Sequence, residues 1–561
     1  MIRVSLLMRD MHAWCWFLPL IWTACTAPPS PETSSAADQA AVIDSVFQTR
    51  EAYSKRYLDS STVAHFLSRA EAAPGDSADI VGFYARRNFQ YAWVVNGALS
   101  QSALAFLDLS RGADTLIPSI RALRERADLL LSTHPGVGKD SLPCDSCLRE
   151  VELGLTALFF RLADQRYSGV VGRDLRELEW FIPRRKKDPS RLIDSLAAGH
   201  MDLGPWEPIH PQYMRLKEHL RQFHLLDSLT EWPHLDLGET RKLEPASSHP
   251  LVPDIRHRLM LLGDLTNEGD TLWMNAPVYD STMVRAVQRF QERHGLHPDG
   301  IIGKGFMAAL NVTPKERLRT LLVNMERLRW VPEQVPPDLI LVNIPEFRMH
   351  VYEAGAEVMS MDVVVGTDAT RTVIFSDSLS QIVFSPTWTI PKSIVRGEIL
   401  PAMAKDPGYL RRKGMERIGG SDANPIIRQK PGAGNALGRV KFLFPNSYSI
   451  YFHDTPSKGF FAREKRAFSH GCIRLSKPTE LAEYLLRNDS TWTPEAIHEA
   501  MYSEKEKYVR LPRKRPVTIG YFTAWVDGTG TLHFRDDVYG HDGRLALELF
   551  GAPMPATVSL R

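Results

Sequence analysis

A surplus of charge of either sign is absent from this sequence. Its 561 residues contain 68 Lys and Arg against 66 Asp and Glu, and 43% of the residues are apolar. This balance does not favour a nucleic-acid partner, and we interpret local basic runs such as PRRKK at 183–187 as solvated surface. The chain is too long for one hydrophobic core, so we expect several domains.

The chain lacks long hydrophobic runs after its N-terminal segment, so we expect no membrane-spanning helix in the rest of the chain. The apolar run AWCWFLPLIW at 13–22 follows two arginines and has the length of a signal-peptide core. Residues 1–25 resemble a lipoprotein signal with Cys25 as the lipidated residue, although Trp22 stands where an aliphatic residue is usual. A Pro-, Ser- and Thr-rich linker follows over 26–45. Ordinary cleavage and an uncleaved anchor are the alternatives to lipidation, and each of the three outcomes exports the chain. We therefore expect an exported, periplasmic protein whose only membrane tether would be an N-terminal lipid or anchor.

Cysteine is scarce, with five residues in all. Cys144 and Cys147 form the pair CDSC, which is compatible with a disulfide, half of a zinc site or a redox pair. No second pair of ligands supports zinc, and no thioredoxin-like pattern supports redox chemistry, so we expect a structural disulfide. Because Cys15 and Cys25 belong to the signal region, Cys472 is left without a partner.

Helical periodicity dominates the first half of the chain. Apolar residues recur every three and four positions over 46–245, as in VELGLTALFFRLADQRY at 151–167, which predicts a helical scaffold domain. This region offers no nucleophile, metal cluster or phosphate-binding loop. A small three-helix unit is expected at 249–312, with Gly263 as a C-cap candidate, and a connecting helix at 315–332.

Beyond residue 338 the periodicity changes to that of strands. Runs rich in β-branched and aromatic residues, such as FRMHVYEAG and EVMSMDVVVG, predict a β-rich domain over 338–526. Within it, residues 394–429 are irregular, basic and contain Gly and Pro, as expected of a lid over a site. We expect residues 527–561 to form a C-terminal tail. The predicted fold class is multidomain α + β.

Cys472 is the candidate nucleophile. A thiol is mostly protonated at neutral pH, so it needs a base or a positive field nearby. His453 ends a strand-like run, and the sequence after Cys472, CIRLSKPTELAEYLL, predicts a helix whose N-terminus would favour the thiolate. Amides of the turn SHGC, which Gly471 allows to come close to a substrate, would point at an oxyanion. Spacing alone leaves catalysis and a buried structural thiol equally open.

The three-helix unit carries a long motif. It has AVxxFQ at 286–291, GL at 295–296, PDGIIG at 298–303 and LN at 310–311. In these residues it resembles the peptidoglycan-binding domain. The resemblance implies docking to a glycan or a stem peptide, or the role of a spacer.

The sequence around Cys472 resembles the L,D-transpeptidases. His453 is followed by fifteen residues and then by SHGCIR at 469–474, in which Arg474 replaces a common Asn. Together with PTWTIP and QKPGAGNALGRVKF, this is similar to the large branch with a helical scaffold and a peptidoglycan-binding domain. The resemblance implies these roles: Cys472 as nucleophile, His453 as general base, Asp454 as its backbone orienter, Gly471 in the oxyanion hole and His470 as an assisting residue.

Four further residues are implied to shape the groove for the donor substrate: Tyr451, Trp388, Asn435 and Arg474. The residues themselves leave alternatives for two of them. Trp388 is equally consistent with a core residue, and Asn435 is equally consistent with a role in the Gly-rich turn PGAGNALG.

The resemblance implies two acyl transfers on peptidoglycan stem peptides, through a cysteinyl thioester, with no metal and no organic cofactor. The expected product is a 3→3 cross-link, and carbapenems are expected to acylate Cys472. An L,D-carboxypeptidase, transfer to a lipoprotein or a D-amino acid, and a non-catalytic wall-anchoring protein remain alternatives. Expected partners are the stem peptides and glycan, with other cell-wall synthesis enzymes as further candidates.

Overall fold

The computed structural model describes ten stretches of the chain. They are residues 56–69, 74–95, 97–110, 119–132, 144–169, 175–183, 193, 210–266, 271–332 and 334–551. The expected signal segment with Cys25 and the linker over 26–45 lie outside them, so both stay predictions. None of the helices in these stretches is long and apolar enough to cross a membrane.

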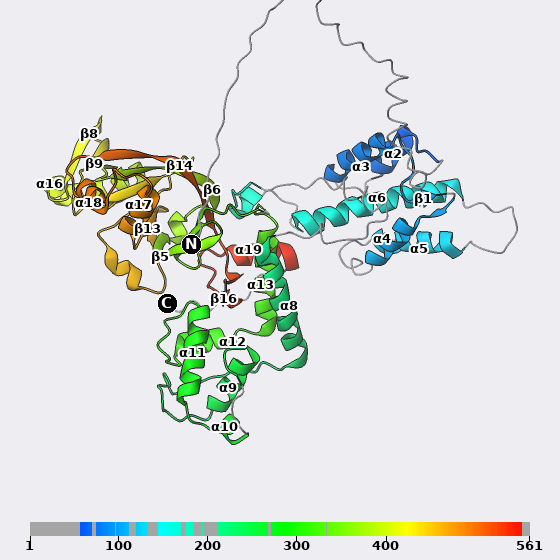
Figure 1. The fold of residues 1–561 in the computed structure, drawn as a ribbon, viewed down its shortest axis with the longest axis horizontal. Helices are drawn as coiled ribbons and strands as arrows, with labels where there is room; N and C mark the ends of the chain where they lie inside the picture. The colour runs from blue at the N-terminus through cyan, green and yellow to red at the C-terminus, as the bar shows by residue number, and fades with distance from the viewer. Residues whose placement is uncertain are drawn as a thin grey trace, which may run out of the picture.

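The first helical unit lies apart from the β-rich body (Figure 1). Its core is aromatic, with Trp93 stacked on Phe106 at 5.3 Å between ring centroids and Phe159 beside both. The long helix over 145–168 contains the apolar run from which the sequence predicts a helix. The elements are α2 (Ser60–Ser68), α3 (Pro74–Arg86), β1 (Val94–Val95), β2 (Ala98–Leu99), α4 (Gln101–Leu109), α5 (Ser119–Ser132) and α6 (Asp145–Ser168).

The disulfide expected in this unit is not formed. Cys144 and Cys147 are both free and exposed. The Cys144 thiol lies 2.7 Å from the Ser146 hydroxyl. The prediction is therefore wrong for this structure, in which Cys144 and Cys147 sit at the start of α6 as thiols.

The small helical unit has its own core. Asp280 caps α11 by accepting from the amides of Thr282 and Met283, and the apolar stripe of α11 that ends at Phe290 is fully buried. Gly263 follows α9 at φ +80°, as its expected C-cap role requires. The helices are α9 (Val252–Leu261), α10 (Thr271–Asn275), α11 (Ser281–Arg293) and α12 (Lys304–Asn311).

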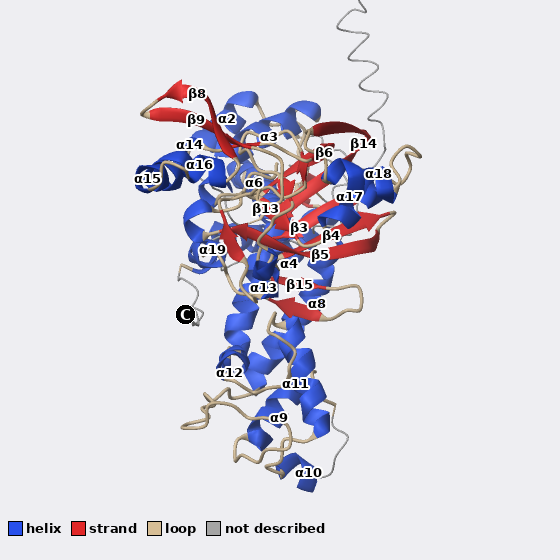
Figure 2. Ribbon diagram, turned by 90° about the vertical axis from the view of Figure 1, so that its left-hand side faces the viewer, coloured by secondary structure: helices blue, strands red, loops and turns tan. Residues whose placement is uncertain are grey.

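The β-rich body is one nine-stranded sheet (Figure 2). Its order is β12-β5-β13-β11-β10-β6-β14-β3-β4, and an additional pairing of β4 with β5 closes it into a ring. β5 is long enough to pair with β4 along one part and with β13 along another. The strands are β3 (Leu339–Asn343), β4 (Arg348–Glu353), β5 (Ala356–Gly366), β6 (Phe375–Phe384), β10 (Val440–Leu443), β11 (Phe452–His453), β12 (Ala467–Ser469), β13 (Ile473–Leu475) and β14 (Lys507–Gly520).

The segment expected as a lid is an ordered subdomain with its own small core around Ile394, Ile399 and Ile427. Its three strands pair in the order β7-β9-β8. The elements are β7 (Trp388–Thr389), α14 (Lys392–Ile394), a π-helical turn (Val395–Ile399), α15 (Leu400–Lys405), α16 (Tyr409–Arg412), β8 (Met415–Ser421) and β9 (Asn424–Gln429).

Two helices join the small helical unit to the body. α8 (Pro211–Leu229) packs on α13 (Pro314–Leu328), and both share a core with the hairpin β15 (Ala524–Val526) and β16 (Leu532–Phe534). Thr313 and Glu316 form a capping box at the start of α13. α8 thus belongs to this core, although the sequence assigns it to the helical scaffold.

The expected C-terminal tail is largely folded. After β16, helix α19 (His541–Phe550) places Leu545 and Ala546 in the core of the body. The remaining helices, α17 (Pro478–Leu486) and α18 (Pro494–Met501), cover the same core. The prediction of a tail over 527–561 is therefore wrong for the described residues, because their apolar side chains complete the body.

Candidate active site

Cys472 lies directly before the short strand β13, whose pairing with β11 brings it beside Tyr451. β11 and β13 run parallel, with Phe452 paired to Ile473 and His453 paired to Arg474. Phe452 and Ile473 are fully buried in the core. Because side chains alternate along strands, the neighbouring positions face the other way. Tyr451, His453, Cys472 and Arg474 therefore share one face of the sheet.

His453 is buried and held in one orientation. Its Nδ1 lies 2.5 Å from the backbone carbonyl oxygen of Asp454, the contact expected from the sequence. A carbonyl only accepts, so Nδ1 carries the proton and Nε2 keeps its lone pair. Burial lowers the pKa of His453 to about 4, and the charge of Arg474 adds to this effect. The imidazole is therefore neutral near pH 7 and able to take a proton.

The Cys472 thiol is protonated at rest. Burial raises its pKa, while hydrogen bonds from Tyr451 and the charge of Arg474 act in the opposite direction. The thiol donates weakly to the carbonyl of Ser449, with 3.6 Å between sulfur and oxygen. Its reactivity thus depends on a base and on the positive field of Arg474.

The prediction of a helix that starts directly after Cys472 is wrong. Residues 473–475 form β13, and α17 begins only at Pro478. Ile473 and Leu475 are both fully buried, so the segment alternates like a strand. Helix α17 therefore does not begin at the thiol, and the nearby positive charge is that of Arg474.

The turn before Cys472 is closed by Ser469. The Ser469 hydroxyl accepts from the Gly471 amide at 3.1 Å and donates to the Cys472 carbonyl at 2.6 Å. Gly471 adopts φ +107°, a conformation that favours glycine. The Gly471 amide is thus engaged inside the turn, which contradicts its predicted place in the oxyanion hole. Within the described residues, the Cys472 amide has no acceptor and is the better candidate donor.

His470 contacts the inserted subdomain. Its side chain is exposed, and its Nε2 lies 3.4 Å from a carboxylate oxygen of Glu398. Glu398 belongs to the π-helical turn of the inserted subdomain. Among the described residues, no hydrogen bond or ion pair joins His470 to Cys472, so no direct contact supports its predicted assisting role.

Asn435 is a structural residue of the Gly-rich turn. Its amide nitrogen donates to the carbonyls of Pro386 and Lys430 at 2.9 Å each, and its oxygen accepts from the Leu437 amide at 2.8 Å. With 1% of its surface exposed, it has no face left for a substrate. The structure contradicts its predicted groove role and supports the alternative.

Trp388 and Arg474 both lie near the thiol. Trp388 packs on the core of the inserted subdomain and hydrogen-bonds the side chain of Tyr451, which also contacts Cys472. The Arg474 guanidinium lies 5.8 Å from the ring centre of Phe460. No carboxylate in the described stretches forms an ion pair with it, and burial lowers its pKa. Arg474 is thus a partly buried cation available to an anionic group.

Three stretches of the chain match known domain families. Residues 337–519 match the L,D-transpeptidase catalytic domain, and residues 78–220 match the scaffold domain. Residues 248–310 match the family described as "Putative peptidoglycan binding domain". Residues 337–519 form an L,D-transpeptidase catalytic domain.

A curated relative from Haemophilus influenzae is described as "Putative L,D-transpeptidase". It is 32% identical over 253 residues, which cover 42% of this chain and 50% of that protein. The chain therefore matches about half the length of this relative.

Two solved L,D-transpeptidase structures are more distant. The one from Stackebrandtia nassauensis is 14% identical over 50% of this chain and 97% of its own, with a TM-score of 0.20. The one from Mycobacterium smegmatis is 14% identical over 33% of this chain and 58% of its own, with a TM-score of 0.18. Scores this low do not establish a shared overall fold.

Several polar residues of the L,D-transpeptidase domain escaped sequence reasoning. Thr370 and Thr372 donate from their hydroxyls to the carbonyls of Ser469 and Gly471. The Thr-rich segment GTDATRT after β5 is the signal that could have drawn attention to them. Glu179, which binds Arg371 in the same segment, lies outside the domain and has no such signal.

Proposed function

We propose that the chain is a peptidoglycan L,D-transpeptidase that forms 3→3 cross-links through a thioester on Cys472. One observation carries the proposal. A neutral, buried His453 with its lone pair on Nε2 shares a face with Cys472 and with Arg474, a cation that lacks a carboxylate partner among the described residues. This arrangement lies within residues that match an L,D-transpeptidase catalytic domain.

In the first transfer, His453 Nε2 takes the thiol proton as the sulfur attacks the carbonyl carbon of the third stem residue. The resulting oxyanion lies near the Cys472 amide, whose N–H has no acceptor among the described residues. Collapse expels the terminal D-alanine, and protonated His453 returns the proton to its amine. The product of this step is a thioester, and His453 is neutral again.

In the second transfer, a side-chain amine of another stem attacks the thioester. His453 takes a proton from that amine, the new amide bond forms, and the thiolate leaves and is reprotonated. Arg474 is suited to bind a carboxylate of the donor stem, because a partly desolvated cation gains most from an anionic partner. Docking of the small helical unit to peptidoglycan and export with a lipidated Cys25 belong to the same proposal.

Covalent labelling tests the nucleophile. The purified chain is incubated with a carbapenem, and the intact mass and the labelled peptide are measured. We expect one adduct on Cys472, none in Cys472→Ser, and at least a tenfold slower adduct formation in His453→Gln, since general bases contribute about 10²–10⁴-fold. A folded wild-type protein without an adduct on Cys472 would overturn the proposed mechanism.

A further inference from the structure

The turn that carries Cys472 is held by a neighbouring loop. Residues 367–372, which we call the brace loop, connect β5 to β6 and contain a short 3₁₀ turn. Three hydrogen bonds join this loop to the turn: Thr367 N to Ser469 O at 3.0 Å, Thr370 Oγ1 to Ser469 O at 2.9 Å, and Thr372 Oγ1 to Gly471 O at 2.8 Å. A shift of the brace loop therefore moves the backbone on which the nucleophile sits.

The brace loop touches the turn and folds back tightly on the end of β5. A Cβ atom on Gly471 would lie 3.5 Å from the Arg371 carbonyl oxygen and 3.7 Å from that of Thr370, which is ordinary van der Waals contact between turn and loop. A Cβ on Gly366, where β5 ends, would lie only 2.0 Å from the Thr370 carbonyl oxygen. Backbones packed this closely transmit displacement rather than absorb it.

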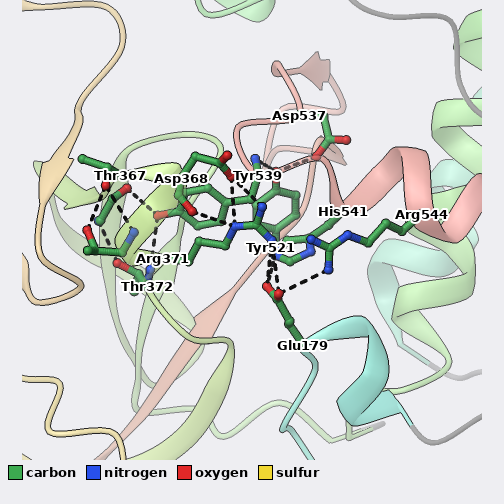
Figure 3. A network of polar contacts seen from close by, with 12 residues as sticks. Glu179, Thr367, Asp368, Arg371, Thr372, Tyr521, Asp537, Tyr539, His541 and Arg544 are labelled. Carbon is green, nitrogen blue, oxygen red and sulfur yellow. Dashed lines mark hydrogen bonds and ion pairs between the residues drawn. The ribbon is translucent and has the colours of Figure 1, made fainter.

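Arg371 anchors the brace loop to a residue outside the catalytic domain. Its Nη1 donates to both carboxylate oxygens of Glu179 at 3.1 Å each, and its Nη2 donates to Asp368 at 2.6 Å (Figure 3). Glu179 precedes Arg371 by 192 positions and leads out of the first helical unit. The Arg371 side chain thus links two distant parts of the chain.

Glu179 is held rigidly in this position. Its backbone has φ +58°, which is unusual for a residue other than glycine. The next residue, Trp180, is buried against Trp330 at 5.4 Å between ring centroids, and the Phe181 amide donates to the Ile374 carbonyl at 3.0 Å. A strained conformation that the surroundings enforce is typical of a functional position.

The carboxylate of Glu179 also meets α19. Arg544 Nη1 donates to it at 3.2 Å, and His541 Nε2 lies 3.6 Å away (Figure 3). Burial alone would raise the pKa of Glu179, but hydrogen bonds from Arg371 and Arg544 outweigh burial and lower that pKa. Glu179 is therefore ionised at neutral pH and joins the brace loop to the C-terminal helix.

We propose that Glu179 is a positioning residue for Cys472, acting through Arg371 and the brace loop. The proposal rests on the proposed function of Cys472 as nucleophile. It assigns a catalytic consequence to two segments outside residues 337–519: the exit of the first helical unit and α19. The donor site itself is not part of the brace, so positioning affects the rate of thioester formation more than the binding of the donor.

A cavity of about 590 Å³ adjoins this network and is lined by Glu179, Arg371, His541 and Arg544. The Glu179 side chain is 40% exposed. Replacement by Gln therefore removes the charge without overpacking or leaving a buried void. We expect Glu179→Gln to fold normally, which allows its effect on reactivity to be separated from stability.

The test measures how fast a carbapenem acylates Cys472 at a series of carbapenem concentrations, in the full chain. This gives a maximal rate constant and a half-saturating concentration. Glu179→Gln is expected to lower the maximal rate constant about tenfold, within the loss that a misplacement of about 1 Å causes, and to leave the half-saturating concentration unchanged. Glu353→Gln is the matched control. It breaks an ion pair with Arg487 whose side-chain exposures, 38% and 31%, are close to the 40% and 23% of Glu179 and Arg371.

Double substitution tests the route through Arg371. If Glu179 acts through Arg371, Glu179→Gln changes the rate little in an Arg371→Gln background, whereas independent effects would multiply. Equal maximal rate constants in Glu179→Gln and Glu353→Gln would overturn the proposal. So would a double variant in which the rate losses of Glu179→Gln and Arg371→Gln multiply. A loss confined to the half-saturating concentration would also overturn it. Absence of acylation in the wild-type chain would instead refute the proposed function.

Discussion

At the scale of single residues, the site combines a protonated thiol with a neutral base. Nδ1 of His453 is engaged by the Asp454 carbonyl, and burial keeps the ring uncharged. The charge of Arg474 assists the thiolate but disfavours a second cation on His453. Before substrate binds, Cys472 and His453 are therefore a neutral thiol and a neutral imidazole, not a thiolate–imidazolium ion pair, and the proton moves only during the attack on substrate.

This state of His453 predicts a pH dependence. Because its pKa is lowered from 6.5 to about 4, the imidazole stays neutral and basic well below pH 6. The acylation rate at low carbapenem concentration reports groups of the free enzyme. On the acidic side, that rate should fall only as the pH drops through about 4.

The measurement uses the wild-type chain between about pH 3.5 and 8, which reaches about three units below and one and a half units above the ordinary histidine pKa of about 6.5, with circular dichroism at each pH as the folding control. A half-maximal point near 6.5 in a folded sample would contradict the proposed state of His453.

The motif around Cys472 predicted the contact between His453 and the Asp454 carbonyl, which the structure confirms, whereas the roles of Cys472 as nucleophile and His453 as base stay predictions. Their contacts are local in the sheet, since β11 and β13 pair directly. The Gly471 prediction failed because the Ser469 hydroxyl competes for the amide, and a sequence pattern does not show which acceptor an amide chooses.

At the scale of elements, the segment after Cys472 carries two signals: side chains that alternate between buried and less buried positions, as in a strand, and a sequence typical of a helix. IRL after Cys472 alternates like a strand, and Pro478 marks the true helix start, so the signals for β13 and α17 were both present. The closed sheet, however, required long-range pairing of β5 with three other strands, which no local pattern specifies.

The Gly-rich turn after β9 supplies a prediction at this scale. Asn435→Ala removes two hydrogen bonds to the carbonyls of Pro386 and Lys430 and a third from the Leu437 amide, and we expect it to lower the free energy of unfolding by about 3 kcal/mol. Urea denaturation of the full chain checks this. Asn424→Ala, at an exposed position of β9 where the side chain accepts from the exposed Arg396, is the control and should change stability less.

If Asn435 instead contacted the donor substrate, its replacement would change carbapenem binding and not stability. Unchanged stability in Asn435→Ala, with a higher half-saturating carbapenem concentration, would contradict the structural assignment.

At the scale of the whole molecule, the C-terminal residues connect the parts. Arg535, just after β16, donates to the Arg293 carbonyl at the end of α11, and the Phe534 ring stacks on His294. The His297 amide donates to Glu464 of the catalytic domain at 3.0 Å. The small helical unit is thus fastened to the body at several points. This could not be predicted from the sequence, because each contact joins residues far apart in it.

The contact between Glu179 and the brace loop also joins residues far apart in the sequence. Glu179 and Arg371 are unremarkable in the sequence, and only the folded chain brings them together behind the catalytic turn. The order of domains was visible from periodicity, whereas the coupling between them was not.

The most direct test of the central claim is a product analysis. The purified chain is incubated with disaccharide tetrapeptides, and the products are separated and sequenced by mass spectrometry. Our account predicts release of D-alanine and dimers joined between the third residues of two stems, both absent with Cys472→Ser. Tripeptides without dimers, or unchanged tetrapeptides with a folded wild-type chain, would contradict it.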